Sequence, residues 1–341
     1  MGKATVVKSK PGFFIVGAPK CGTTVLDHYL GLHSDVFMAR KEMHFFGSDL
    51  HFGSQFYRRD EAAYRSEFDA ADGHKVIGES SVWYLSSERA AAEIKAFNPE
   101  ARIIIMVREP VEMLHSLYHQ FLFDGNENLP TFERALAAEN DRCAGKFVPR
   151  LNYFPQGLVY RRAVDFAPQV RRYFEVFGRD RVHVIVYDEI AADAPAVYAR
   201  VLDFLGLKPF RIERGLQVIN GNKFVKHTAL RAVLNDPVLR SAVLGIRPWL
   251  PRSIFSALQR TEARLQKLNA RPIGRQPLDP KLRWRLTEEF APAVEQLGNL
   301  LDRDLSSWSR CQHWHQDVET PELAGSLASV EACPEPVVQA H

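Results

Sequence analysis

The chain has 341 residues and a mass of 38.8 kDa, enough for one large α/β domain or two small ones at about 100–200 residues per domain. Apolar residues make up 46% and charged residues 25%, which excludes collagen-like, coiled-coil and wholly disordered classes. The formal net charge is +3, but residues 316–341 are acidic and hold no Lys or Arg. The basic body that precedes them suits an anionic ligand, with solvated helix faces as the alternative explanation.

Buried strands and helices alternate from the N-terminus to Gly206. Apolar runs predict parallel core strands at Phe13–Val16, Ile103–Val107 and Val182–Val186, with a weaker one at Lys75–Ile77. Helical patterns begin at Thr23 and then cover Glu88–Phe97, Val111–Phe123, Val159–Phe177 and Ala194–Leu205. This alternation predicts an α/β fold, a single domain with a central parallel sheet flanked by helices.

The pattern changes after Gly206. Gln217–His227 predicts a polar loop, prolines interrupt the helical segments that follow, and a last helix is expected over Lys281–Leu301. The basic amphipathic stretch Val238–Arg271 predicts a helical subdomain beside the functional site, with a membrane-surface helix as the alternative. We assign residues 1–10 to an N-terminal extension, 11–315 to the domain, and 316–341 to an acidic tail whose composition predicts disorder.

The most informative segment is Gly17-Ala18-Pro19-Lys20-Cys21-Gly22-Thr23-Thr24, which follows the first strand and begins a helix. Such a loop aims backbone N–H groups and the positive end of the helix at an anion. Its glycine spacing matches the start of a nucleotide-triphosphatase loop, but Thr23 stands where that motif has Lys, and Lys20 comes earlier. An ordinary strand-to-helix turn is the alternative.

Arg108 and Ser116 form a second candidate anion site. Arg108 follows the Ile103–Val107 strand, where a triphosphatase would carry a magnesium-holding Asp. Pro110 suits the first position of the next helix, and Ser116 lies about two turns along it. Arg offers a fork for phosphate oxygens and Ser a neutral donor. Because ligands gather at the carboxyl edge of open α/β sheets, both residues are expected beside the first loop.

In these two blocks the sequence resembles the sulfotransferases that use 3′-phosphoadenosine 5′-phosphosulfate (PAPS), especially their bacterial and heparan-sulfate-type branch. Pro19–Thr24 is similar to their 5′-phosphosulfate loop, and Arg108 with Ser116 to their 3′-phosphate motif. The similarity covers most of residues 11–310 and includes Gly78–Ser81, Phe204–Leu207 and Arg303–Trp308. It implies a P-loop-like sulfotransferase fold, PAPS as co-substrate, adenosine 3′,5′-bisphosphate (PAP) as product and no required metal.

The resemblance also implies catalytic residues. Sulfuryl transfer needs a base for the acceptor proton and positive charge at the leaving group, and Lys20 is placed to supply that charge. Glu42-Met43-His44-Phe45-Phe46 resembles the family's Glu-x-His-Phe-Phe element, whose Glu is the base. Glu42 is therefore the expected base, with a pKa lowered by the adjacent Lys41. His44 is the rival base, and a structural role for both is the third interpretation.

Further positions bear on the donor and the acceptor. Lys223 and Lys226 fall in the family's third donor-binding segment and are candidates for holding the 3′-phosphate, with surface lysines as the alternative. Gly47 departs from some glycan enzymes, which carry an acidic residue there. The acceptor is expected to be a hydroxyl or amine of a small molecule, glycan or lipid. Its pocket is expected around His44–Tyr57, the aromatic stretch Gln120–Pro155 and the Trp249 region.

Competing functions remain open at this point. One alternative is a P-loop-type nucleotide-binding or phosphoryl-transfer protein, an NTPase or kinase, and another is a non-catalytic anion-binding module. Neither nucleic acid nor a membrane is an expected partner. The four distant cysteines predict neither a disulfide scaffold nor a metal site. Together with an N-terminus that lacks a signal-peptide pattern, they predict a cytoplasmic protein.

Overall fold

The computed structural model describes residues 10–53, 59–150, 152–210, 223–225, 270–272 and 277–310. Its main sheet has five parallel strands in the order β2-β3-β1-β4-β5: β1 (Phe13–Gly17), β2 (Val36–Met38), β3 (Val76–Ser80), β4 (Arg102–Val107) and β5 (Val182–Val186). β1 and β4 are buried along nearly their whole length, as parallel strands covered on both faces are. The four predicted strands are confirmed, and β2 was not predicted.

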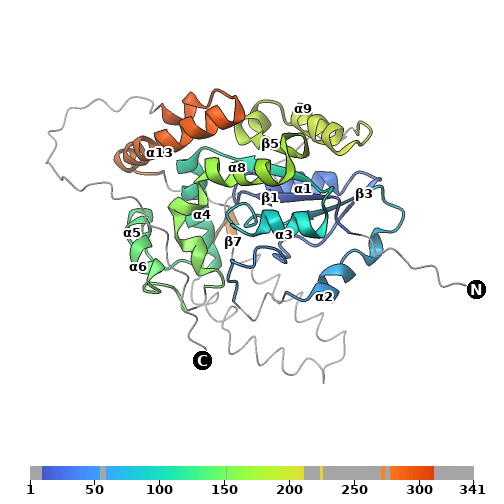
Figure 1. Cartoon of the computed structure of the whole chain (residues 1–341). Helices are drawn as coiled ribbons and strands as arrows, with labels where there is room; N and C mark the ends of the chain where they lie inside the picture. Colours follow the sequence, from blue (N-terminus) through green and yellow to red (C-terminus); the bar gives the residue numbers. More distant parts are fainter. Residues whose placement is uncertain are drawn as a thin grey trace, which may run out of the picture.

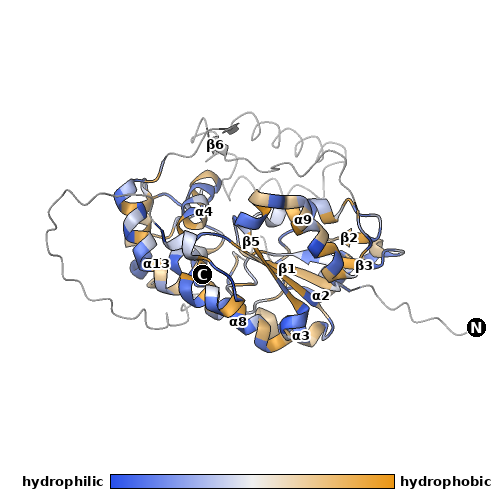
Figure 2. Cartoon of the chain, turned by 90° about the horizontal axis from the view of Figure 1, so that it is seen from above, coloured by the Kyte–Doolittle hydropathy of each residue, from blue (hydrophilic) through white to orange (hydrophobic). Residues whose placement is uncertain are grey.

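Helices cover both faces of this sheet (Figure 1). α3 (Ala90–Phe97) and α8 (Phe166–Phe177) lie on one side of the strands and α9 (Tyr187–Leu205) on the other (Figure 2). α13 (Pro280–Leu301) packs against α8, and α1 (Thr23–Leu30) against β1 and β2. The remaining described helices are α2 (Glu61–Ser66), α4 (Pro110–Asp124), α5 (Phe132–Ala137), α6 (Glu139–Cys143) and α7 (Tyr160–Ala163), with 3₁₀ turns at Asp69–Ala71, Pro155–Leu158, Arg179–Arg181 and Ser306–Ser309.

α4 begins and ends where its sequence dictates. The Glu109 carboxylate accepts hydrogen bonds from the backbone N–H groups of Val111 and Glu112, and Pro110 takes the first helical position. Gly125 ends the helix in the left-handed conformation, with φ of 74°. These signals fix α4 directly after β4, so its first turns lie at the carboxyl edge of the sheet.

Two predicted helices and one predicted loop need correction. The helix expected over Val159–Phe177 is divided into α7 and α8, because Asp165 has non-helical backbone angles. α9 begins at Tyr187, earlier than predicted, and is kinked at Asp193, whose carboxylate accepts the backbone N–H of Ala196. The segment predicted as a polar loop contains strand β6 (Lys223–Val225), which pairs antiparallel with β7 (Ala270–Pro272). The acidic tail and most of Val238–Arg271 lie outside the described residues.

The cysteines differ from each other in state. Cys21 is a buried free thiol, whereas Cys143, at the end of α6, takes part in a disulfide bond. The sequence predicted no disulfide scaffold, and the bond at Cys143 is a disulfide that it did not foresee. The cytoplasmic location was inferred partly from the cysteine spacing and stays a prediction. The Cys143 disulfide speaks against it, because disulfides persist in oxidising compartments. Within the described ranges, no helix is both long enough and apolar enough to cross a membrane.

Candidate active site

The loop after β1 is fixed by two glycines and one backbone contact. A side chain at Gly17 would collide with the carbonyl oxygen of Val82, so only glycine fits there. Gly22 has φ of 92°, a left-handed conformation that glycine adopts without strain, immediately before α1. The backbone N–H of Ala18 donates to the carbonyl oxygen of Met106 at 2.6 Å and ties the loop to β4. The amino end of α1 is thereby held at the carboxyl edge of the sheet.

Lys20 extends from this loop toward α4. Its backbone is left-handed, with φ of 62°, and its Nζ donates to Oε1 of Gln120 at 3.1 Å. The Gln120 amide in turn donates to Asp124 at 2.7 Å. The contact places the ammonium group between the loop and the helix that carries Ser116, as expected for a lysine that meets an anion there.

Arg108 joins the end of β4 to the loop. One guanidinium nitrogen donates to the carbonyl oxygen of Lys20 at 3.2 Å, and another lies 3.5 Å from the Glu112 carboxylate. The guanidinium carbon lies 4.5 Å from the centroid of the Tyr187 ring, within cation–π range. The structure thus brings Arg108 and the Lys20 loop together, as the sequence predicted.

Ser116 lies inside α4 with only 2% of its surface exposed. Its Oγ has no hydrogen-bond partner among the residues that the structure describes. A buried hydroxyl without a partner costs about 1–3 kcal/mol, and such groups call for an explanation, which a bound ligand would supply. This observation supports the prediction that Ser116 contacts the donor.

The other loop residues have simpler roles. Burial raises the pKa of the Cys21 thiol to about 12, although the charges of Arg108 and Lys20 lower it in part. The thiol is therefore neutral and acts as a small buried side chain. Thr23 is 4% exposed and Thr24 is partly exposed, both in the first turn of α1.

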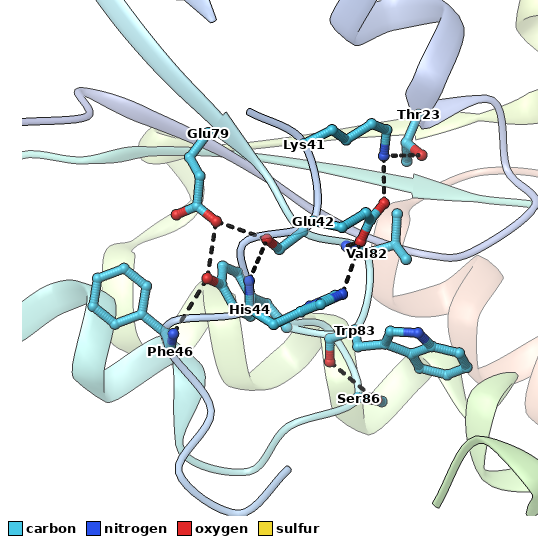
Figure 3. A network of polar contacts seen from close by, with 11 residues as sticks. Thr23, Lys41, Glu42, His44, Phe46, Glu79, Val82, Trp83 and Ser86 are labelled. Carbon is cyan, nitrogen blue, oxygen red and sulfur yellow. Dashed lines mark hydrogen bonds and ion pairs between the residues drawn. The ribbon is translucent and has the colours of Figure 1, made fainter. Parts of the chain in front are cut away.

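Glu42 lies between a lysine and a histidine (Figure 3). Lys41 Nζ is 2.6 Å from Oε1 of Glu42, while Oε2 accepts from the backbone N–H of Val82 and lies 3.1 Å from Nε2 of His44. The backbone N–H of Glu42 donates to the carbonyl oxygen of Ser80 at 2.8 Å, which fixes the segment to the end of β3. Both carboxylate oxygens are thus oriented before any substrate binds.

These contacts decide the charge of Glu42. Partial burial acts to raise its pKa, but the hydrogen bond from His44 and the charge of Lys41 outweigh that effect and bring the pKa to about 2. The predicted lowering is confirmed. The carboxylate is 32% exposed, whereas the His44 side chain is 2% exposed and stacked on Phe52 at 4.3 Å. This arrangement favours Glu42 as the group that meets an acceptor and His44 as the group that orients it.

A buried carboxyl group, Glu79, anchors this segment through a network of hydrogen bonds. It is fully buried and accepts hydrogen bonds from the hydroxyls of Tyr64, Ser81 and Tyr84 at 2.7 to 2.8 Å. Ser81 Oγ accepts from the backbone N–H of His44, and Tyr84 OH from that of Phe46. Glu79 therefore holds residues 44–46 in place. Burial raises its pKa to about 7 despite the three donors.

The sequence marked Glu79 only as part of Gly78–Ser81, a stretch similar to the sulfotransferases, and did not predict its partners. A carboxyl residue at the end of a buried strand was the available signal, whereas Tyr64 comes from α2 and no local pattern links it to β3. Lys41 was considered only as a neighbour of Glu42. The structure adds a second contact, because Lys41 Nζ lies 3.4 Å from Oγ1 of Thr23.

The remaining predicted residues are only partly described. Lys223 lies in β6, whose backbone is close to α4, the helix that carries Ser116. Lys226 lies outside the described residues, so its proposed contact with the 3′-phosphate stays a prediction.

Aromatic rings line the side of the site next to His44. Phe52 stacks on His44 and, at 4.4 Å, on Phe154, whose ring lies 4.7 Å from that of Trp83. Phe121 on α4 is stacked on Trp83 at 6.2 Å. Two segments predicted to form the acceptor pocket, His44–Tyr57 and Gln120–Pro155, therefore meet beside Glu42.

Comparisons with known proteins place this architecture among the sulfotransferases. A model of the Sulfotransferase family matches residues 11–211. The crystal structure of a sulfotransferase from Alicyclobacillus acidocaldarius superposes with a TM-score of 0.64 at 32% identity, covering 89% of this chain and 100% of that one. The chain belongs to the sulfotransferase family, and its parallel sheet with flanking helices is the P-loop-like fold of that family.

Curated relatives point to the same family. Human heparan sulfate glucosamine 3-O-sulfotransferase 6 is 29% identical over 238 residues, which are 70% of this chain and 61% of that protein. Human heparan sulfate glucosamine 3-O-sulfotransferase 3B1 is 28% identical over 201 residues, 59% of this chain and 47% of that protein. The matches thus span only about half to three fifths of the length of these relatives.

Proposed function

We propose that this protein transfers the sulfuryl group of PAPS to a hydroxyl or amine acceptor and releases PAP. Membership of the sulfotransferase family supports the reaction class. The observation that carries the proposal is the chain of contacts Glu42–Lys41–Thr23, which sets an ionised carboxylate beside the anion-binding loop. A proton acceptor and a phosphosulfate site at this spacing are what an in-line transfer requires.

The donor site follows from the cations and donors around the loop. Lys20, Thr23 and Thr24, with the amino end of α1, would hold the 5′-phosphosulfate. Arg108 and Ser116 would hold the 3′-phosphate, and the Ser116 Oγ, which has no partner in the described part of the chain, supports that assignment. Lys223 and Lys226 would add positive charge to the same phosphate.

In the proposed transfer, a side chain of the site assists each bond that forms or breaks. The acceptor oxygen or nitrogen forms a bond to sulfur while the bond from sulfur to the 5′-phosphate oxygen breaks. Glu42 takes the proton that the acceptor loses, and His44 keeps the carboxylate oriented. Lys20 neutralises the charge that develops on the departing phosphate oxygen. In this scheme the residues of the chain serve every bond change, and no metal ion is required.

The acceptor is proposed only as a class, a small molecule, glycan or lipid that carries a hydroxyl or amine. The named relatives are heparan sulfate sulfotransferases, which supports a sugar acceptor. Phe52, which is partly exposed and stacked on the buried ring of Phe154, supplies an apolar ring of the kind that sugars and aromatic alcohols both contact.

Two measurements test the proposal. The purified protein should show a rise in melting temperature with PAP in the absence of magnesium, and no rise would refute the donor assignment. Glu42→Gln should abolish PAPS-dependent transfer without weakening PAP binding, whereas the exposed control Glu100→Gln should leave both unchanged. Full turnover in Glu42→Gln would refute its role as base, and hydrolysis of ATP with magnesium would favour an NTPase or kinase instead.

A further inference from the structure

We propose that Lys41 is a donor-binding residue, shared between Glu42 and the 5′ anionic group of the donor, so that donor binding releases the base from its ion pair. The inference rests on the proposed function and adds to it a coupling between the two halves of the site. Its basis is the position of one ammonium group, 2.6 Å from Oε1 of Glu42 and 3.4 Å from Oγ1 of Thr23.

The backbone holds Lys41 at this junction. Two hydrogen bonds flank it, from the N–H of Ala39 to the oxygen of Gly78 at 3.0 Å and from the N–H of Glu42 to the oxygen of Ser80 at 2.8 Å. The Lys41 side chain is 20% exposed. A lysine has a flexible stem and three rotatable N–H donors, so it can exchange one acceptor for another without backbone movement.

The charges around Lys41 already exceed what one cation can neutralise. Besides the Glu42 carboxylate, the charge of Lys41 attracts the carboxylate of Asp27, which lies one turn along α1 from Thr23. The imidazole of His28 also favours the charged form of Asp27. Burial raises the pKa of Asp27 to about 6; Lys41 lowers it in part and Glu42 raises it further. Oδ1 of Asp27 has no hydrogen-bond partner in the described part of the chain. A phosphate in the adjoining loop brings a further anion to the same ammonium group.

Competition for Lys41 has a direct chemical consequence. When the donor's 5′ group attracts the ammonium, Glu42 loses part of the ion pair that makes it a weak base, and its affinity for a proton increases. Glu42 is therefore a stronger base when the donor is bound than when it is not. Because coupling between two binding events is reciprocal, removing the charge of Glu42 must strengthen binding of the 5′ group.

Calorimetric titration with two ligands tests the proposal. PAP carries both phosphates, whereas adenosine 3′-monophosphate lacks the 5′ group. Glu42→Gln should bind PAP about two- to fivefold more tightly than the wild type, the size expected for a partly exposed ion pair. Lys41→Met should weaken PAP binding about tenfold, the effect of losing a charged hydrogen bond. Neither change should alter affinity for the monophosphate.

Two further variants sharpen the test. The gain from Glu42→Gln should vanish when it is combined with Lys41→Met. The control Lys75→Met removes an exposed lysine paired with Asp35 and should change neither affinity. Should Lys41→Met fold poorly, Glu42→Gln with the two ligands still decides the matter.

The contrary outcomes are distinct. Unchanged PAP affinity in Glu42→Gln, or equal weakening of both ligands by Lys41→Met, would overturn the inference, because a merely structural Lys41 would behave in that way. Absence of PAP binding by the wild type would instead refute the proposed function and the inference together.

Discussion

Glu79→Gln should make the folding stability of this protein less dependent on pH. Burial raises the pKa of Glu79 from an ordinary 4.5 to about 7. The folded protein therefore holds this proton more tightly than the unfolded chain does. The resulting stabilisation is complete below about pH 4.5 and is lost as the pH rises through 7. At about 1.4 kcal/mol per pH unit, the loss amounts to about 3 kcal/mol.

Glutamine is neutral at every pH and has nearly the same shape, so it lacks this loss. The unfolding free energy of Glu79→Gln, relative to the wild type, should rise by about 2.5 kcal/mol between about pH 5 and pH 8. Urea denaturation at several pH values measures the difference, with Glu100→Gln as an exposed control. Parallel stability curves for Glu79→Gln and wild type would refute the reasoning. Glu79→Ala should differ again, because it leaves three hydroxyls without an acceptor and costs about 1–3 kcal/mol for each at any pH.

Three other substitutions test the donor loop. Lys20→Met should lower kcat by about 10²–10³-fold, measured as PAP release, and an unchanged kcat would exclude its role at the leaving group. Ser116→Ala removes a buried hydroxyl that has no partner among the described residues, so it should raise the unfolding free energy by about 1 kcal/mol yet weaken PAP binding by about 1 kcal/mol; equal PAP affinity would remove Ser116 from the site. Gly22→Ala forces a side chain into φ of 92° and should lower the unfolding free energy measured by urea denaturation by about 1–2 kcal/mol; an unchanged value would refute the strain expected at this position.

The sheet was largely predictable because its inner strands are continuous apolar runs. β2 was missed because Val36–Met38 is too short for periodicity to show. The break between α7 and α8 had a local signal, since Asp165 precedes a helix whose third residue is Pro168, and proline suits a first helical turn. The kink of α9 at Asp193 had the same kind of signal in Pro195.

Some residues of the site could be predicted from the sequence, whereas the contacts between them could not. Lys20, Arg108 and Glu42 were found because each sits at a strand end or within a motif of fixed local spacing. The partnership of Glu79 with Tyr64 joins β3 to α2, and the contact of Lys41 with Thr23 joins the segment after β2 to α1. Side-chain contacts of this kind depend on the packing of separate elements, so no periodicity or motif encodes them.

The most direct test of the central claim is mass spectrometry of an acceptor mixture incubated with the protein and PAPS. We predict an acceptor that gains one SO₃ group, with matching release of PAP, for the wild type and not for Glu42→Gln. No gain of SO₃ by any acceptor, or an equal gain with Glu42→Gln, would contradict the account.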